Sequence, residues 1–245
     1  MSDLLVKNDV PAAVLASCYP VFQPLVQLET GAPAGYEALL RSAASESPER
    51  LFRTARAGGF LYELDTGAIR QAVSCYFGEI PDPRRAPLLF MNIFPSTLLH
   101  PSFDRFMEDD LFRRHPPSGQ MVLEINEAHE EEKMWDIQLL GDKIRELRRL
   151  GFLIALDDVG SGAASLRKIV EYEPDIVKLD RYFGNQLAAS PGKQKLVSLF
   201  VDYCSGSSGL VLEGLEEADD LAMARLLGVP IGQGFLLGRP GSGRF

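Results

Sequence analysis

The 245-residue sequence is poor in cysteine, histidine and tryptophan, with three, three and one of these residues. The cysteines, Cys18, Cys75 and Cys204, are widely spaced and show no paired arrangement. An odd and scattered set of cysteines argues against a disulfide scaffold and is typical of a reduced intracellular protein.

The sequence also lacks an excess of positive charge and any long hydrophobic run. It has 25 basic and 34 acidic residues, for a net charge of −9. This balance argues against a surface for nucleic acid or an anionic membrane, because both need a basic field. An anionic substrate stays compatible with it, since bound metal ions can reverse the local sign. No run approaches the roughly 20 apolar residues of a membrane span, and the N-terminus does not resemble a signal peptide. We therefore expect a soluble cytoplasmic protein.

An apolar content of 46% excludes disorder and allows a sizeable core. Short apolar runs alternate with longer segments of helical periodicity, such as Glu130–Leu150 with its apolar stripe of Leu139, Leu140, Ile144 and Leu147. The predicted strands are 20–28, Tyr36–Arg41, Leu88–Ile93, Met121–Ile125, Phe152–Leu156, Asp175–Leu179, Leu210–Leu212 and Ile231–Leu236.

The connection between the first two predicted strands, residues 29–35, is short enough for a hairpin, which predicts an antiparallel pair. The later strands alternate with helices, as in repeated βαβ units. This pattern favours an α/β fold with a closed (β/α)8 barrel over an open sheet. No linker divides the chain, so we expect a single domain over residues 1–245 with a core at about 18–240.

The consecutive apolar strands after the first each carry a polar or charged residue within or just after the run. These residues are Glu37, Asn92, Glu124, Asp157 with Asp158, Lys178, Glu213 and Gln233. Barrel strands are buried on both faces, where an unpaired charge costs several kcal/mol or more. The C-terminal ends of the strands converge on one face of such a barrel, which is where active sites lie. Five carboxylates around one mouth would repel one another, which predicts bound cations.

The donor set of this predicted site consists of oxygens, with Asn92 as a neutral carbonyl donor, and it favours Mg²⁺ or Mn²⁺. Two such ions would suit displacement at phosphorus. Lys178 would add a compact positive charge near the attacking water, and Arg41 could bind a phosphate bidentately. The residues alone leave alternatives open. Asp157 and Asp158 could cap a following helix, Lys178 could neutralise a neighbouring carboxylate, and an enolase-type proton abstraction would use the same groups.

Eight segments carry ordered motifs over about residues 18–240. They are Phe22–Val26, Glu37–Arg41, Met91–Pro95, Leu123–Glu127, Leu156–Gly162, Val177–Asp180, Leu212–Glu216 and Gly232–Phe235. In this order they resemble the EAL domain family of bacterial cyclic di-GMP phosphodiesterases, and the ordered set is more specific than any single motif.

The resemblance implies a modified TIM barrel whose first strand is antiparallel, and metal-dependent hydrolysis of cyclic di-GMP to linear pGpG with one or two Mg²⁺ or Mn²⁺ ions. It also implies roles for particular residues. The first metal would be held by Glu37, Asn92, Glu124 and Asp157, and the second metal site would include Asp158. Lys178 would orient the attacking water, Glu213 would act as a metal ligand or base, and Gln233 would lie near that water. The substrate contacts would be Gln23, Arg41 and Pro95, and Glu127 would anchor the loop after Asp158. In the family this loop couples metal binding to dimerisation, so a homodimer is an expectation.

The sequence departs from the family pattern in three places. In the loop after Asp158, Val159, Ser161, Ala163 and Ala164 replace Phe, Thr, Tyr and Ser. Arg56 replaces a Glu that follows Ala in the family, and Phe94 replaces a usual Ser. None of these changes removes a predicted metal ligand, which favours an active enzyme. The alternative is a catalytically impaired receptor that binds cyclic di-GMP and acts through a protein partner.

Overall fold

The computed structural model describes residues 12–44, 47–112, 118–125, 131, 137–160 and 165–243. Its strands form one closed barrel in the sequence order β1 to β8. Their bounds are β1 Cys18–Gln27, β2 Pro33–Ser42, β3 Leu88–Ile93, β4 Met121–Ile125, β5 Leu153–Val159, β6 Ile176–Leu179, β7 Gly209–Leu212 and β8 Ile231–Gly232.

The first strand runs against both of its neighbours. β1 pairs antiparallel with β2 and with β8, whereas each pair from β2 to β8 is parallel. The predicted barrel with an antiparallel first strand is therefore confirmed. The eighth strand is shorter than predicted, because it ends at Gly232 rather than Leu236. The chain turns there against Leu215, whose backbone N–H donates to the Gln233 carbonyl, and a Cβ on Gly234 would lie 2.1 Å from the Leu215 carbonyl oxygen.

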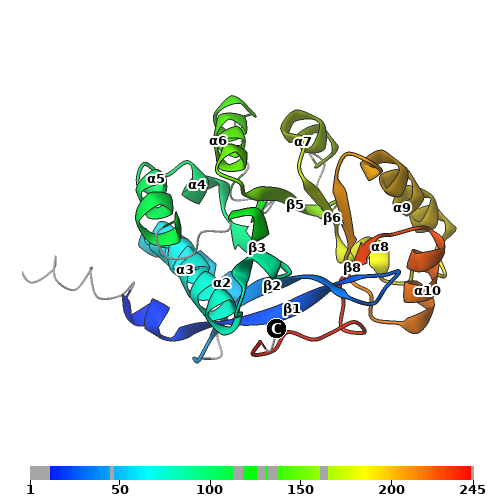
Figure 1. The fold of residues 1–245 in the computed structure, drawn as a ribbon, viewed down its shortest axis with the longest axis horizontal. Helices are drawn as coiled ribbons and strands as arrows, with labels where there is room; N and C mark the ends of the chain where they lie inside the picture. Colours follow the sequence, from blue (N-terminus) through cyan, green and yellow to red (C-terminus); the bar gives the residue numbers. More distant parts are fainter. Residues whose placement is uncertain are drawn as a thin grey trace, which may run out of the picture.

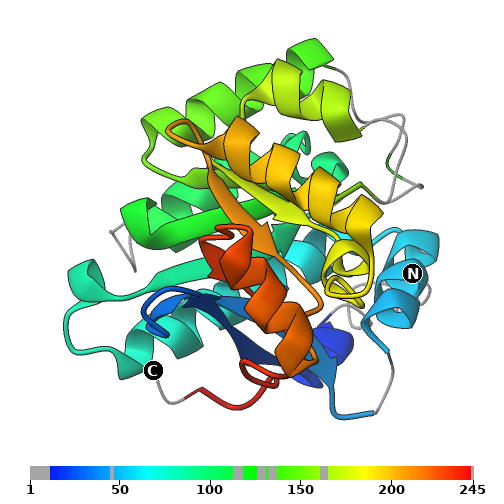
Figure 2. The same ribbon diagram turned by 90° about the vertical axis from the view of Figure 1, so that its right-hand side faces the viewer.

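The helices surround the strands (Figure 1), and the view from the side shows the barrel strands crossing between them (Figure 2). Their bounds are α2 Pro48–Gly58, α3 Leu61–Glu79, α4 Pro95–Leu98, α5 Phe103–Phe106, α6 Ile137–Arg149, α7 Ser165–Tyr172, α8 Arg181–Gly184, α9 Pro191–Cys204 and α10 Ala218–Leu226. Short helical turns are η1 Pro83–Arg85, η2 Met107–Phe112 and η3 Ser118–Gln120. None of the helices in the described ranges has the length and apolar character that a membrane crossing requires.

Helix α6 confirms part of the predicted amphipathic segment. Leu140, Ile144 and Leu147 are buried against the barrel, as their spacing predicts. Leu139 was wrongly included in the stripe, because its side chain is 60% exposed. It lies one position from Leu140, and one residue along a helix turns the side chain by about 100°, away from the buried face. The helix begins at Ile137, and residues 130 and 132–136 lie outside the described residues.

The apolar core has two layers, inside and outside the barrel. The inner layer consists of Leu25, Phe90, Val122, Ala155, Ile176 and Val211. The strand residues between these positions, such as Met91 and Leu123, pack in the larger cluster shared with the helices. Gly35 makes room in the inner layer, since a Cβ there would lie 2.6 Å from the Phe90 ring. The inner layer closes the barrel beneath the site described next.

Candidate active site

A ring of polar side chains lies directly above the inner apolar layer. Side chains two residues apart on a strand point to the same face, so each inner apolar residue predicts the position of a second inward residue. The pairs are Leu25 with Gln23, Gly35 with Glu37, Phe90 with Asn92, Val122 with Glu124, Ala155 with Asp157, Ile176 with Lys178, Val211 with Glu213 and Ile231 with Gln233. Gln23 precedes its partner because β1 runs in the opposite direction. Every barrel strand thus contributes one polar residue to the same level.

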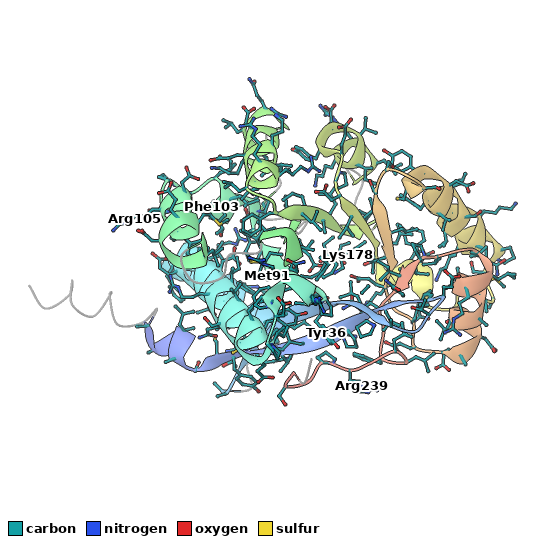
Figure 3. The ribbon with its side chains drawn as sticks, viewed as in Figure 1. Tyr36, Met91, Phe103, Arg105, Lys178 and Arg239 are labelled. Atoms are coloured by element: carbon teal, nitrogen blue, oxygen red, sulfur yellow. The ribbon has the colours of Figure 1, made fainter. Side chains whose placement is uncertain are left out.

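Lys178 lies among the strands at the centre of this ring, and its side chain is 1% exposed (Figure 3). Its Nζ is 2.7 Å from Glu124 Oε1, 2.8 Å from Glu213 Oε1, 3.0 Å from Asp157 Oδ1 and 3.6 Å from Glu37 Oε2. The alternative that Lys178 neutralises a neighbouring carboxylate, Asp180 or Glu213, holds for Glu213, and the ammonium also contacts three other carboxylates. One buried cation therefore holds together residues of β2, β4, β5 and β6 and Glu213, which directly follows β7.

Amide side chains complete the ring. Asn92 Nδ2 donates to Glu37 Oε1 at 3.0 Å and to Glu124 Oε2 at 3.3 Å. Gln233 Nε2 donates to Glu37 Oε2 at 2.6 Å and to Gln23 Oε1 at 3.3 Å. Gln23 Nε2 donates in turn to the Gly238 carbonyl at 3.1 Å. These bonds fix the carboxylate of Glu37 from two sides.

Burial raises the pKa of two carboxyl groups of the ring, those of Glu124 and Glu213. Burial raises the pKa of Glu124 well above its usual value, with Glu37 and Asp157 adding to the effect and Lys178 opposing it. Burial raises the pKa of Glu213 to about 8. Burial would lower the pKa of Lys178, but the four surrounding carboxylates raise it well above the usual value. The ring is a negative site that one internal cation does not fully balance.

The second carboxylate of the Asp157–Asp158 pair reaches the same site through a backbone irregularity. Neighbouring residues of a regular strand point to opposite faces. Here the register of β5 against β6 shifts between Leu156 and Val159, and Asp158 has a φ of 54°. Burial, followed by the charge of Asp157, raises the pKa of Asp158 to about 7. Both aspartates belong to β5, and residues 161–164, which precede the following helix, lie outside the described residues, so the capping alternative stays untested.

The ring fits a divalent cation by the chemistry of its buried oxygens. Within the described residues, Glu124 Oε1, Asp157 Oδ1 and Gln233 Oε1 are buried and accept no well-formed hydrogen bond, although Lys178 lies close to the first two. Carboxylate oxygens of Asp157, Asp158 and Glu213 lie within 4.8 Å of one another. Hard oxygen donors of this kind suit Mg²⁺, Mn²⁺ or Ca²⁺.

A cavity of about 610 Å³ opens from this ring, within the roughly 300–1,000 Å³ usual for a ligand site. Glu37, Asn92 and Asp157 form part of its lining, and so does Arg41. Arg41 Nη1 donates to the Leu40 carbonyl at 2.8 Å, which orients the guanidinium at the cavity wall. The cavity therefore joins the oxygen ligands to a cationic side chain suited to phosphate.

The comparisons with known proteins agree with this geometry. The family model described as EAL domain matches residues 8–240. The chain belongs to the EAL domain family.

Curated relatives include the probable cyclic di-GMP phosphodiesterase PdeI of Escherichia coli, which is 27% identical over 243 residues, covering 96% of this chain and 30% of that protein. A cyclic di-GMP phosphodiesterase of Pseudomonas aeruginosa is 28% identical over 226 residues, covering 90% of this chain and 38% of that protein. The chain thus spans about a third of the length of these two relatives.

Among solved structures, BlrP1 of Klebsiella pneumoniae in a calcium and cy-diGMP complex has a TM-score of 0.82 at 26% identity, covering 93% of this chain and 57% of that chain. The same protein in a manganese and cy-diGMP complex has a TM-score of 0.81 at 25% identity, covering 92% of this chain and 56% of that chain.

One predicted site residue, Pro95, lies apart from the ring of this EAL domain. Pro95 is buried as the first residue of α4, directly after Phe94. Glu127 lies outside the described residues, as do loop positions 161–164. Val159, which replaces the family's Phe, is fully buried in the core. The roles predicted for Pro95 and Glu127 therefore stay predictions.

Two buried acids near the cavity were missed by the strand-end pattern, because neither lies on a strand. Asp65 of α3 is 2% exposed and accepts from the Phe94 backbone N–H at 3.0 Å. Burial raises the pKa of Asp65 to about 7. Glu131 is 1% exposed, accepts from the Ser96 backbone N–H at 2.8 Å and pairs with Arg56. Both hold the connection between β3 and α4, and no sequence pattern singles them out.

Proposed function

We propose that the chain is a metal-dependent phosphodiesterase that hydrolyses cyclic di-GMP to linear pGpG. The observation that carries the proposal is the closed ring of oxygen donors around Lys178, which opens into a cavity lined by Arg41. Family membership supports the substrate, since relatives named cyclic di-GMP phosphodiesterases align over nearly the whole chain. The cy-diGMP complexes of BlrP1 with calcium and manganese support a divalent-metal site in this fold.

The ring divides into two sets of proposed ligands. The first ion would be held by Glu37, Asn92, Glu124 and Asp157, and the second by Asp158 and Glu213. Bound Mg²⁺ or Mn²⁺ would supply Lewis-acid polarisation of the phosphate and a lowered pKa for the attacking water. Mg²⁺ and Mn²⁺ are equally compatible with the donor set.

The side chains of the chain itself position the reactants. Lys178 is held protonated by its four carboxylates, and its three N–H donors face Glu124, Glu213 and Asp157. A donor released when an ion takes over one of these carboxylates would orient the water and stabilise negative charge at phosphorus. The unpaired Gln233 Oε1 is an acceptor that can orient that water. Arg41 binds the phosphate at the cavity wall. The water oxygen would form a bond to phosphorus and one P–O ester bond would break. Of the two protons of the water, one would end on the released ribose oxygen and the other on the new phosphate monoester or in solvent.

The alternative is an EAL domain that binds cyclic di-GMP without turnover and signals through a protein partner. The replacement of the family's Phe by Val159 favours it, because Val159 fills less of the core directly after the second aspartate. The intact ligand ring supports the enzyme instead. A scaffold without nucleotide chemistry has little need for buried charges at five strand ends.

A pair of glutamate variants tests the proposed function. We expect Glu37→Ala to abolish formation of pGpG, because it removes a proposed ligand that Asn92 and Gln233 hold in place. Glu29→Ala is the matched control, because Glu29 is exposed in the turn between β1 and β2. Products are separated by chromatography after incubation with Mn²⁺. Hydrolysis that persists in Glu37→Ala would exclude the proposed site.

Other properties expected from the sequence stay predictions. These are a single domain over residues 1–245, a cytoplasmic location, the absence of nucleic-acid and membrane partners, and a homodimer.

A further inference from the structure

The cavity continues from the metal-ligand ring to the first helix after β2. Phe52, Arg53 and Arg56 of α2 line it, together with Phe94 at the end of β3. Phe52 and Arg56 are four residues apart, which places them on the same face of the helix. This part of the cavity contains none of the oxygen ligands and two of the positions where the sequence departs from the family, Arg56 and Phe94.

Aromatic rings and a guanidinium are packed together here. The Phe52 and Phe94 rings meet edge to face with centroids 5.2 Å apart. Arg56 Cζ lies 5.3 Å from the Phe94 ring centroid, a cation–π arrangement. Phe94 therefore contacts both Phe52 and Arg56, and these contacts hold the three side chains together.

The Arg56 guanidinium is held by an ion pair and also lines the cavity. It forms an ion pair with Glu131, whose side chain is 1% exposed and also binds the Ser96 backbone N–H. The Arg56 side chain is itself 31% exposed and lines the cavity. Glu131 is the one side chain that it hydrogen-bonds within the described residues, while the buried Asp65 is close enough to interact with it by charge. A guanidinium has five N–H donors. The anchor orients the guanidinium and leaves donors available to a ligand.

This combination matches the chemistry of a purine base. Aromatic side chains and guanidinium planes stack on bases, and an arginine binds the O6 and N7 acceptors of guanine with two parallel hydrogen bonds. Adenine offers a donor at the position of O6, so the same fork fits it poorly. A phosphate would use the charge of Arg56 but would gain nothing from the rings.

We propose that Arg56, Phe94 and Phe52 form a recognition site for one guanine base, in which Arg56 reads the base edge and the rings provide the stacking surface. This inference rests on the proposed function, because it concerns the same substrate. Arg56 is a specificity-determining residue, and Glu131 is a positioning residue that acts through it. The site lies apart from the hydrolytic groups, so it affects which substrate binds rather than the chemical step.

The test compares binding of two dinucleotides that differ in their bases. Dissociation constants for cyclic di-GMP and cyclic di-AMP are measured by calorimetry in Ca²⁺. Arg56→Lys keeps the charge that Glu131 requires but loses the planar fork. We expect it to weaken cyclic di-GMP binding by roughly tenfold and to leave cyclic di-AMP binding nearly unchanged, so that selectivity falls. Arg50→Lys, an exposed position on the same helix, is the control and changes neither constant.

A second variant, Phe94→Ser, restores the family's residue and leaves the Arg56–Glu131 ion pair in place. We expect it to weaken the binding of both dinucleotides by roughly fivefold or more, because an aromatic ring stacks on any base. The rise in melting temperature that Mn²⁺ produces should be unchanged in both variants, because neither residue is a proposed metal ligand.

If Arg56→Lys weakened the binding of both dinucleotides equally, the proposal would be overturned. Absence of cyclic di-GMP binding to the unmodified chain would also overturn it. Binding with the expected selectivity but no turnover would support the guanine site and refute the hydrolytic function.

Discussion

Lys178→Met gives the most direct prediction about the stability of the site. The substitution keeps most of the side-chain volume and removes the ammonium, leaving four carboxylates without their common cation. At an effective dielectric constant of about 20, each contact shorter than 3 Å contributes roughly 6 kcal/mol of Coulomb attraction before desolvation. Desolvation and the repulsion among the carboxylates offset most of it. Breaking a buried ion pair by removing one partner costs about 3–5 kcal/mol net.

We therefore expect Lys178→Met to lower the free energy of unfolding by about 3–5 kcal/mol at pH 7.5 in a chelator. Urea unfolding followed by circular dichroism measures this loss. Because a divalent cation can replace the missing charge, Mn²⁺ should raise the melting temperature of Lys178→Met by more than that of the unmodified chain.

Lys143→Met is the matched control. Lys143 Nζ lies 2.6 Å from Asp104 Oδ1 and 2.7 Å from Glu146 Oε2, distances as short as those of Lys178. Its two partners are 64% and 47% exposed, so solvent screens the pairs. We expect a loss of about 1 kcal/mol or less. Equal losses for the two lysines would refute the reasoning that buried charge holds the ring together.

Three further predictions concern single residues. Asp157→Asn should reduce the rise in melting temperature that Mn²⁺ produces in the unmodified chain, and an unchanged rise would remove Asp157 from the ligand set. The folded-state pKa of Asp65 is raised to about 7 from 3.8, so its contribution to stability falls as the pH rises from about 4 to 7. The unfolding free energy of Asp65→Asn, compared with that of the unmodified chain, should therefore rise by roughly 3–4 kcal/mol as the pH increases from 4 to 8. Parallel pH profiles of the two proteins would contradict this. A Cβ at Gly184 would lie 1.8 Å from the Glu213 carbonyl oxygen, whereas one at Gly192 would touch nothing within 4 Å. Gly184→Ala should lower stability by about 1–3 kcal/mol and reduce hydrolysis by displacing Glu213, with Gly192→Ala near neutral for both.

The strand pattern predicts much of the fold and most of the ring. β3 and β4 have the predicted bounds, because each is an apolar run with the inward polar residue near its end. The period of two along a strand and the convergence of parallel strands are local and topological rules, so they can be applied to a sequence alone. These rules predict that Asn92 and Glu124 point into the barrel at the level of the ring, without any knowledge of their contacts.

Other features depend on contacts between distant segments. Arg56 and Glu131 are 75 residues apart and lie on no common strand pattern, so their ion pair follows only from the folded barrel. The bend that turns Asp158 toward Asp157 depends on the register of β5 against β6. The number of carboxylates that share Lys178 depends on side-chain geometry at the centre of the closed barrel, which the sequence does not specify.

Hydrolysis of cyclic di-GMP by the purified chain tests the central claim most directly. The protein is incubated with cyclic di-GMP in Mn²⁺, in Mg²⁺ and in a chelator, and the products are separated by chromatography. We expect linear pGpG with at least one of the two metals and none in the chelator. Intact cyclic di-GMP under all three conditions, from a folded protein, would contradict it.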